Sequence, residues 1–136
     1  MGPKSLKKIV TEAHKRNKGV IALCHMSAPE AKLSYELNVK LSKNQKPKPL
    51  YQMFLKWAVS NKADGIIVGA TYPKIVNHCK KIVGKKLDIY SPGVGTQGGN
   101  AKKAITNGSD FLIVGRTILG SKNPTRTAKQ LKLAGT

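Results

Sequence analysis

The hydrophobic residues of the chain follow two patterns that alternate from one end to the other. Helical spacing covers residues 4–17, 50–62, 73–83, 100–107 and 124–133, and short apolar runs cover residues 20–24, 65–69, 87–90 and 111–114. The runs are bounded by glycine and other turn residues, which is typical of strands buried on both faces of a sheet. The pattern therefore predicts one helix followed by four strand–helix pairs.

Two further expectations concern the middle of the chain. Residues 41–49 are basic and contain two prolines, so we expect an exposed loop there. The helix that follows is expected to pack inward through five side chains at helical spacing, Leu50, Met53, Phe54, Trp57 and Ala58.

Strands that alternate with helices form a parallel sheet, so the predicted fold class is α/β. Two glycine-containing β-to-α loops lie late in the chain, where a (β/α)8 TIM-type barrel carries its phosphate site. Such a barrel needs eight strands, and this chain supplies four. We therefore expect residues 1–136 to form a single truncated domain, a four-stranded parallel half of a (β/α)8 TIM-type barrel with flanking helices. Its open sheet edges call for a second half-barrel or a second copy of the chain to cover them. The alternative is that the sheet has flattened into an open sandwich.

The chain is also strongly basic along its whole length. The chain carries 25 Lys and Arg against 6 Asp and Glu, a formal net charge of +19. The excess is +10 in residues 1–63, with 13 basic and 3 acidic residues, and +9 in residues 64–136, with 12 and 3. A surface that is basic throughout attracts polyanions, above all RNA. The alternative is a lysine-rich proteome with no specific partner.

Composition also indicates the cellular compartment and the way in which RNA would be bound. No run approaches the ~20 apolar residues of a membrane span, and the N-terminal sequence has no secretory apolar region, so we expect a cytoplasmic protein without membrane contact. Cys24 and Cys79 are expected to be reduced, buried thiols. Aromatic residues make up 5% of the chain, too few for a base-stacking platform. RNA would therefore be bound by Lys and Arg contacts to phosphates.

The strongest candidate site is the run SPGVGTQGG at residues 91–99, which holds four glycines. Glycine lets backbone amides approach an anion, and a helix is predicted just beyond the run. Gln97 adds a neutral hydrogen-bond donor. The next strand ends directly in Gly115-Arg116, where two amides and a guanidinium suit a phosphate dianion. The alternatives are a glycine-rich turn without a ligand and an ordinary surface arginine.

A third candidate is the turn HMSAPEA after the first predicted strand. Ser27 in this turn has a side chain that can hydrogen-bond a ligand. It can equally cap a helix opened by Pro29, with Glu30 in the first turn, and the residues alone favour the cap.

Other chemistry finds no support in the sequence. The three histidines and two cysteines lack zinc-site spacing, and neither a Walker A motif nor GxGxxG is present. We therefore expect no metal and no cofactor.

Four segments together carry a family resemblance: HMSAPEA, DGIIVGATYP, SPGVGTQGG and GRTILGSKNP. They resemble the C-terminal half of orotidine 5′-phosphate decarboxylase in its archaeal form, and the similarity runs from about residue 4 to residue 133. That family is a dimeric (β/α)8 barrel of pyrimidine biosynthesis. It converts orotidine monophosphate to UMP without a cofactor.

The resemblance implies a role for each candidate residue. Ser27 would hydrogen-bond the pyrimidine ring, and Pro92 would lie beside the base. Gln97 would close over the nucleotide and reach its phosphate. The amides of Gly115 and Arg116, together with the Arg116 side chain, would hold the phosphate.

The sequence also departs from the family pattern. Asn100 stands where the family commonly has an acidic residue. More importantly, the family's catalytic Asp-x-Lys-x-x-Asp motif belongs to its N-terminal half, and no aspartate of this chain has a lysine two residues later. The chain is thus expected to hold substrate-binding residues and no catalytic residues, so that alone it is not an active decarboxylase.

Three hypotheses follow from these observations. The spread of positive charge favours a decarboxylase-like half-barrel that keeps its nucleotide-phosphate pocket and now binds RNA, as a ribosome-associated protein. The alternative is the phosphate- and UMP-binding half of a split decarboxylase that needs a separate N-terminal half. The third hypothesis is a degenerate gene product whose charge reflects its proteome.

Overall fold

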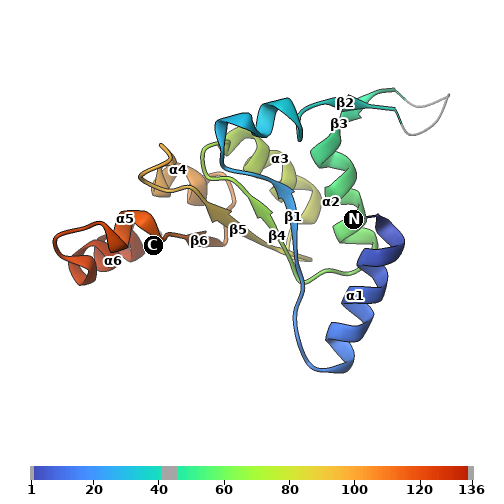
Figure 1. The fold of residues 1–136 in the computed structure, drawn as a ribbon, viewed down its shortest axis with the longest axis horizontal. Coiled ribbons are helices and arrows are strands. Elements are labelled where there is room, and N and C mark those ends of the chain that lie inside the picture. The colour runs from blue at the N-terminus through green and yellow to red at the C-terminus, as the bar shows by residue number, and fades with distance from the viewer. Residues whose placement is uncertain (1, 41–45, 135–136) are drawn as a thin grey trace.

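The computed structural model describes residues 2–40 and 46–134 of the chain (Figure 1). In order, its elements are α1 (Pro3–Lys15), β1 (Ile21–His25), the 3-10 helix η1 (Pro29–Leu33), β2 (Asn38–Val39), β3 (Lys48–Pro49), α2 (Leu50–Ser60), β4 (Gly65–Val68), α3 (Pro73–Val83), β5 (Asp88–Pro92), α4 (Ala101–Thr106), β6 (Phe111–Ile113), α5 (Arg116–Leu119) and α6 (Pro124–Leu133).

The main sheet has four strands in the order β1-β4-β5-β6, and every neighbouring pair is parallel. The predicted four-stranded parallel sheet is therefore confirmed. The strands follow one another in space as they do in sequence, with α2, α3 and α4 in the connections. This is the topology of consecutive (β/α) units.

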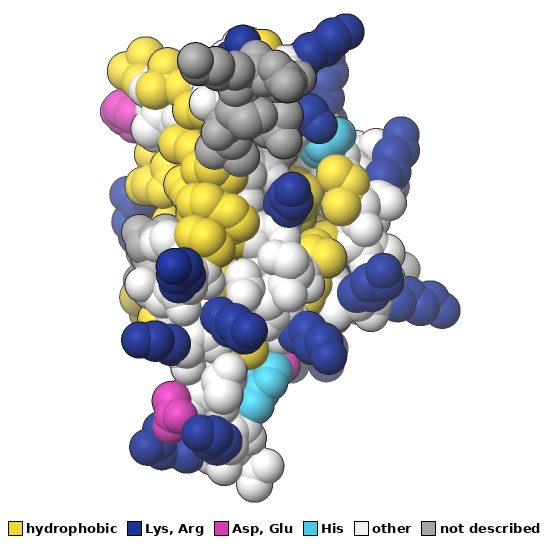
Figure 2. Space-filling model, turned by 90° about the vertical axis from the view of Figure 1, so that its right-hand side faces the viewer, with side chains coloured by type: hydrophobic (Ala, Val, Ile, Leu, Met, Phe, Trp, Pro, Cys, Tyr) yellow, Lys and Arg dark blue, Asp and Glu magenta, His cyan; other side chains and the backbone are white. Residues whose placement is uncertain are grey.

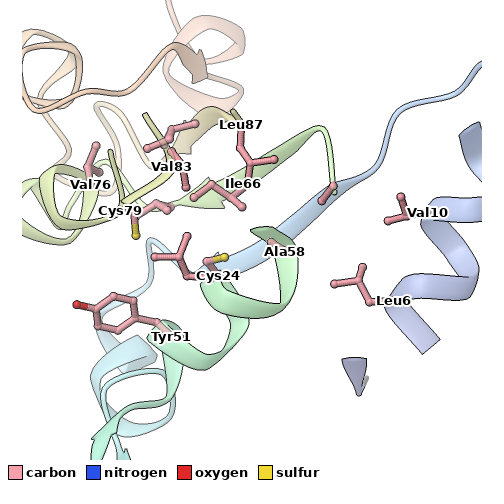
Figure 3. Close-up of a cluster of buried hydrophobic side chains, with 14 residues drawn as sticks. Leu6, Val10, Cys24, Tyr51, Ala58, Ile66, Val76, Cys79, Val83 and Leu87 are labelled. Carbon is pink, nitrogen blue, oxygen red and sulfur yellow. The ribbon is translucent and has the colours of Figure 1, made fainter. Parts of the chain in front are cut away.

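One face of the sheet carries the core. Ile66 of β4 and Ile89 of β5 are fully buried against α2 and α3, which contribute Leu55, Val76 and other apolar side chains. Figure 3 shows Ile66 next to Cys79 and Val83 of α3, and Cys24 beside Ala58 of α2. Both cysteines are free and buried, and burial raises the pKa of Cys79 to about 12.

The opposite face of the sheet is open, which corrects the expectation of strands buried on both faces. Ile21 and Leu23 of β1 are 45% and 44% exposed, and Phe111 and Ile113 of β6 are 49% and 46% exposed. The strand register places these side chains on one face, because partners in a parallel pair point the same way. Among the described residues, the helices that bury the strands lie on the other side of the sheet.

The face through which α2 packs overlaps only in part with the predicted one, with Ala58 buried as expected. Its buried residues are Tyr51, Leu55 and Ala58, whereas Phe54 and Trp57 are only partly buried against the core. The helix is apolar on most of its circumference, so spacing alone does not select the inward face.

The expectation of a loop over residues 41–49 was partly wrong. Lys48–Pro49 forms the short strand β3, which pairs antiparallel with β2. Residues 41–45 of that segment lie outside the described residues. The four-residue helix α5 was not predicted at all, since its length is too short for a periodic signal. No helix within the described ranges is long and apolar enough to cross a membrane.

Two aspartates hold the edge of the sheet at which the strands begin. The Asp64 carboxylate accepts a 2.7 Å hydrogen bond from the Val20 amide and lies 3.0 Å from His14 Nε2. The Val20 hydrogen bond, followed by that to His14, lowers the pKa of Asp64. Asp110 repeats the arrangement by accepting a 2.8 Å hydrogen bond from the Ile89 amide. The opposite edge, where the strands end, carries the candidate site.

Candidate functional site

The candidate residues come from loops that follow β1, β5 and β6 and meet at the carboxyl edge of the sheet. In a parallel sheet all strands end at the same edge, so loops far apart in sequence become neighbours there. The loop after β4 lies between them and supplies Gly69. A Cβ on this glycine would stand 2.5 Å from Ser27 Cα and 2.7 Å from the Met26 carbonyl oxygen. Only glycine at this position lets the first loop cross so closely.

The glycine-rich loop after β5 folds back on itself. The Gly99 amide donates to the Gly93 carbonyl at 3.0 Å, and the Gly95 amide donates to the Gly99 carbonyl at 2.9 Å. Gly93, Gly95 and Gly98 have positive φ angles of 94°, 80° and 85°, a region that side-chain-bearing residues rarely adopt. Positive φ thus accounts for three of the four glycines, and a Cβ on the fourth, Gly99, would stand 2.5 Å from the Gly93 carbonyl oxygen.

The Ser27 hydroxyl donates a 2.9 Å hydrogen bond to Gln97 Oε1. This contact joins two predicted site residues that are 70 positions apart in the sequence. The helix cap that the residues alone favoured for Ser27 is wrong, because η1 is preceded by Ala28 and has no side-chain cap. Gly93 lies beside the pair: a Cβ there would stand 2.6 Å from Ser27 Cβ and 3.0 Å from Gln97 Oε1.

The loop after β6 is fastened to the glycine-rich loop by Thr117, a residue that sequence reasoning missed. Its hydroxyl donates to the Val94 carbonyl at 2.9 Å and accepts from the Thr96 amide at 3.2 Å. A Cβ on Gly95 would collide with Thr117. No sequence signal distinguishes this threonine from others, since its role comes from the meeting of two loops.

Arg116 precedes Thr117 and begins α5, with Gly115 at the N-cap position. The Arg116 side chain is exposed, and within residues 2–40 and 46–134 its guanidinium has no hydrogen bond or ion pair. Thr117 therefore holds Arg116 next to the glycine-rich loop while its charge stays available to an anion.

Pro92 ends β5 on the open side of the sheet. It is the register partner of Ile113, and its carbonyl accepts a 2.8 Å hydrogen bond from the Ala70 amide. Its ring is partly exposed beside the loop that carries Gln97. Asn100, at the end of the same loop, caps α4 by accepting a 2.9 Å hydrogen bond from the Lys103 amide. The side-chain carboxamide of Asn100 thus serves as the N-cap of α4.

No group of three or more His, Cys, Asp or Glu side chains in the described part of the chain is placed to hold a metal ion. What the edge offers a ligand is a hydroxyl, a carboxamide, glycine amides and a guanidinium. These are groups that recognise a phosphate and a polar ring.

Consecutive parallel (β/α) units of this kind are the building units of a (β/α)8 barrel, of which this chain supplies four strands. The family model that matches residues 1–131 is that of the orotidine 5′-phosphate decarboxylase / HUMPS family, and the chain belongs to this family. An orotidine 5′-phosphate decarboxylase of Methanococcoides burtonii is 42% identical over 84 residues, which are 62% of this chain and 39% of that protein. Another, from Methanococcus maripaludis, is 34% identical over 135 residues, 98% of this chain and 56% of that protein.

A solved structure shows the same relation in three dimensions. Orotidine 5′-monophosphate decarboxylase from Methanocaldococcus jannaschii, complexed with the inhibitor BMP, superposes with a TM-score of 0.82 and 30% identity. The match covers 98% of this chain and 56% of that one. The chain thus spans about half the length of the relatives that it matches, and the predicted half of a TIM-type barrel is confirmed.

The crowding at Gly93 gives a test of the site geometry. We expect Gly93→Ala to displace Ser27 and Gln97 and to lower the free energy of unfolding by about 2–3 kcal/mol, from φ strain plus the collision. Gly98→Ala is the matched control, because Gly98 has a similar φ and no atom within 4 Å of an added Cβ. It should cost only the strain, about 1 kcal/mol.

The measurements are urea unfolding and the NMR amide resonance of Ser27. That resonance should move in Gly93→Ala and stay in Gly98→Ala. Equal effects of the two substitutions would contradict the proximity of Gly93 to Ser27.

Proposed function

We propose that the chain binds a pyrimidine nucleoside monophosphate, UMP or orotidine monophosphate, as the substrate-holding part of an orotidine 5′-phosphate decarboxylase. The observation that carries this proposal is the Ser27–Gln97 hydrogen bond at 2.9 Å, which joins the loops after β1 and β5 at one point. In the proposal, Ser27 contacts the pyrimidine ring and Pro92 lies beside it. Gln97 covers the nucleotide, and Gly115 and Arg116 hold the phosphate.

The orientation of Gln97 supports this assignment of donors. Its Oε1 accepts from Ser27, so its amide Nε2 is left to donate outward. In the proposal, the same phosphate dianion is also bound by the Arg116 guanidinium, which has no hydrogen bond or ion pair within the described ranges. Charge-assisted hydrogen bonds from a guanidinium are the stronger contribution of the two.

We further propose that the groups that perform decarboxylation come from a complementary (β/α) unit seated on the open face of the sheet. The 136 residues contain no Asp-x-Lys-x-x-Asp motif, so the proposed catalytic contribution of this chain is none. The exposed side chains Leu23, Phe111 and Ile113 supply an apolar face for such a unit. In this proposal residues 1–136 act as one half-barrel unit, and no cofactor is needed.

Removal of the Arg116 charge tests nucleotide binding. We expect Arg116→Ala to raise the Kd for UMP roughly tenfold to a hundredfold, because a charged hydrogen-bond donor to the phosphate is lost. Isothermal titration calorimetry measures the effect. Arg126→Ala is the matched control, since it removes one exposed arginine from α6 that is not among the proposed site residues. Equal Kd values for the two variants would contradict the proposal.

A substitution on the open face tests the complementary unit. The probe is the part of the Methanococcus maripaludis decarboxylase that this chain does not cover, added as a separate polypeptide. We expect decarboxylation of orotidine monophosphate with both polypeptides and none with this chain alone. Leu23→Lys should abolish the activity of the mixture, because it places a charge in the buried interface.

The control for that experiment is Ile82→Lys on α3. Ile82 is 50% exposed, much like Leu23 at 44%, but it lies on a helix rather than on the open sheet face. It should leave the activity of the mixture unchanged. Activity that survives Leu23→Lys would overturn the proposed position of the partner.

RNA binding is a second candidate function. The observation that favours it is that most Lys and Arg side chains form no ion pair with a carboxylate in the described part of the chain. Among the described residues, Lys15, Arg16 and Lys80 are the Lys and Arg side chains in ion pairs with carboxylates. Figure 2 shows Lys and Arg side chains dispersed over the whole visible face, around patches of hydrophobic residues. A single phosphate site does not account for so many cations. A ribosome-associated role would use them on the RNA backbone.

Salt dependence tests this second function. We expect the logarithm of the affinity for total RNA to fall linearly with the logarithm of salt concentration, with a slope of about −0.7 for each single-strand phosphate contacted. Filter binding and co-sedimentation with ribosomes measure it, and Arg116→Ala should change the slope by no more than one contact. Association that ignores salt, or no association, would contradict RNA binding.

A further inference from the structure

The loop that presents Ser27 is held by three side chains that each donate to a successive backbone carbonyl. His25 Nδ1 lies 2.8 Å from the Met26 carbonyl oxygen. The Thr71 hydroxyl donates to the Ser27 carbonyl at 2.9 Å, and the Tyr72 hydroxyl donates to the Ala28 carbonyl at 2.9 Å. We call these three donors the carbonyl clamp.

A β-bulge turns His25 toward the core. In the register of β1 with β4, Leu23 pairs with Ile67 and His25 with Val68, so that Cys24 is the extra residue. Without the bulge, His25 would share the open face with Leu23. With it, both Cys24 and His25 are fully buried.

The buried imidazole is packed among aromatic rings. Its ring meets the rings of Tyr35, Tyr51 and Tyr72 at centroid distances of 5.6, 5.8 and 4.5 Å. Its Nε2 lies 3.3 Å from Glu36 Oε1, but neither of these two buried atoms makes a hydrogen bond within the described residues. Burial is the main cause that raises the pKa of Tyr72, so its hydroxyl keeps its proton and remains a donor at neutral pH.

We propose that Thr71 and Tyr72 are positioning residues that set the Ser27 hydroxyl against Gln97, and so govern recognition of the base rather than of the phosphate. The inference rests on the proposed nucleotide-binding function. The phosphate loops have a separate support, since Thr117 joins them through Val94 and Thr96. Weakening the clamp therefore releases Ser27 and leaves the Arg116 side of the site in place.

The split between base and phosphate can be measured with two ligands. UMP carries both groups, whereas ribose 5-phosphate carries only the phosphate and the sugar. We expect the double variant Thr71→Val with Tyr72→Phe to raise the Kd for UMP about tenfold and the Kd for ribose 5-phosphate at most about threefold, because the released Gln97 weakens its own phosphate contact while Arg116 stays in place. Both substitutions keep the shape of the side chain and remove only its hydroxyl donor.

Four further variants provide controls for this test. Tyr35→Phe is the matched control, because it removes a phenolic hydroxyl next to His25 that forms no hydrogen bond in the described part of the chain, and it should leave both Kd values unchanged. Thr71→Ser retains a hydroxyl, so combined with Tyr72→Phe it should recover about half of the logarithmic loss. Ser27→Ala should match the double variant, and adding it to that variant should cause little further loss.

The outcomes separate this inference from the proposed function. An unchanged Kd for UMP in the double variant, or equal losses for UMP and ribose 5-phosphate, would overturn the clamp. A wild-type chain that binds neither ligand would contradict nucleotide binding. Amide hydrogen exchange would then test whether the carbonyl clamp holds the Ser27 loop, independently of any ligand. The Ala31 and Gly69 amides, which donate to Ala28 and His25, should exchange at least tenfold faster in the double variant and not in Tyr35→Phe. Unchanged exchange would overturn it.

Discussion

The site depends on one steric constraint, the crossing of the loop after β1 over the start of the loop after β4. Gly69 leaves room for the backbone of Met26 and Ser27, where any Cβ would stand 2.5 Å from Ser27 Cα. At this crossing the Ser27 carbonyl accepts a hydrogen bond from the Thr71 hydroxyl, and the Ser27 hydroxyl donates one to Gln97. The strand ends, the glycine spacing and the polar contacts of the site therefore form one arrangement, not several independent features.

Three acidic residues of this basic chain contact backbone amides or a buried side chain of the fold. Asp64 and Asp110 accept hydrogen bonds from backbone amides at the start of the sheet, and Asp110 also lies 2.7 Å from Lys80. Glu36 pairs with the buried His25 behind the site. Glu30 and Asp88 have no side-chain hydrogen bond or ion pair among the described residues, and most lysines project into solvent. A charge excess that is spread over the surface in this way attracts polyanions without determining the fold.

The order of strands and helices could be predicted because the apolar runs and the glycines that end them are local signals. The edge that collects Gln97, Gly115 and Arg116 followed from the parallel sheet. Other features could not be predicted, because they arise where distant segments meet. Spacing favoured Ser27 as a helix cap, since Gln97 is 70 residues away. The bulge at Cys24, which buries His25, also has no local signature, as a one-residue slip leaves the apolar composition unchanged.

The proposed nucleotide and the proposed complementary unit would share one face of the sheet. Pro92, placed beside the base, is the register partner of Ile113, and both lie on the side that exposes Leu23 and Phe111. A unit seated there would cover the base as well as the apolar strands, excluding water from the reacting ring. The nucleotide would then strengthen binding of the complementary unit, and the unit would strengthen binding of the nucleotide by the same free energy. The two effects are equal because linkage between two ligands of one protein is reciprocal. On the open face, the nucleotide held by this chain would thus meet the groups for decarboxylation that the proposed complementary unit supplies.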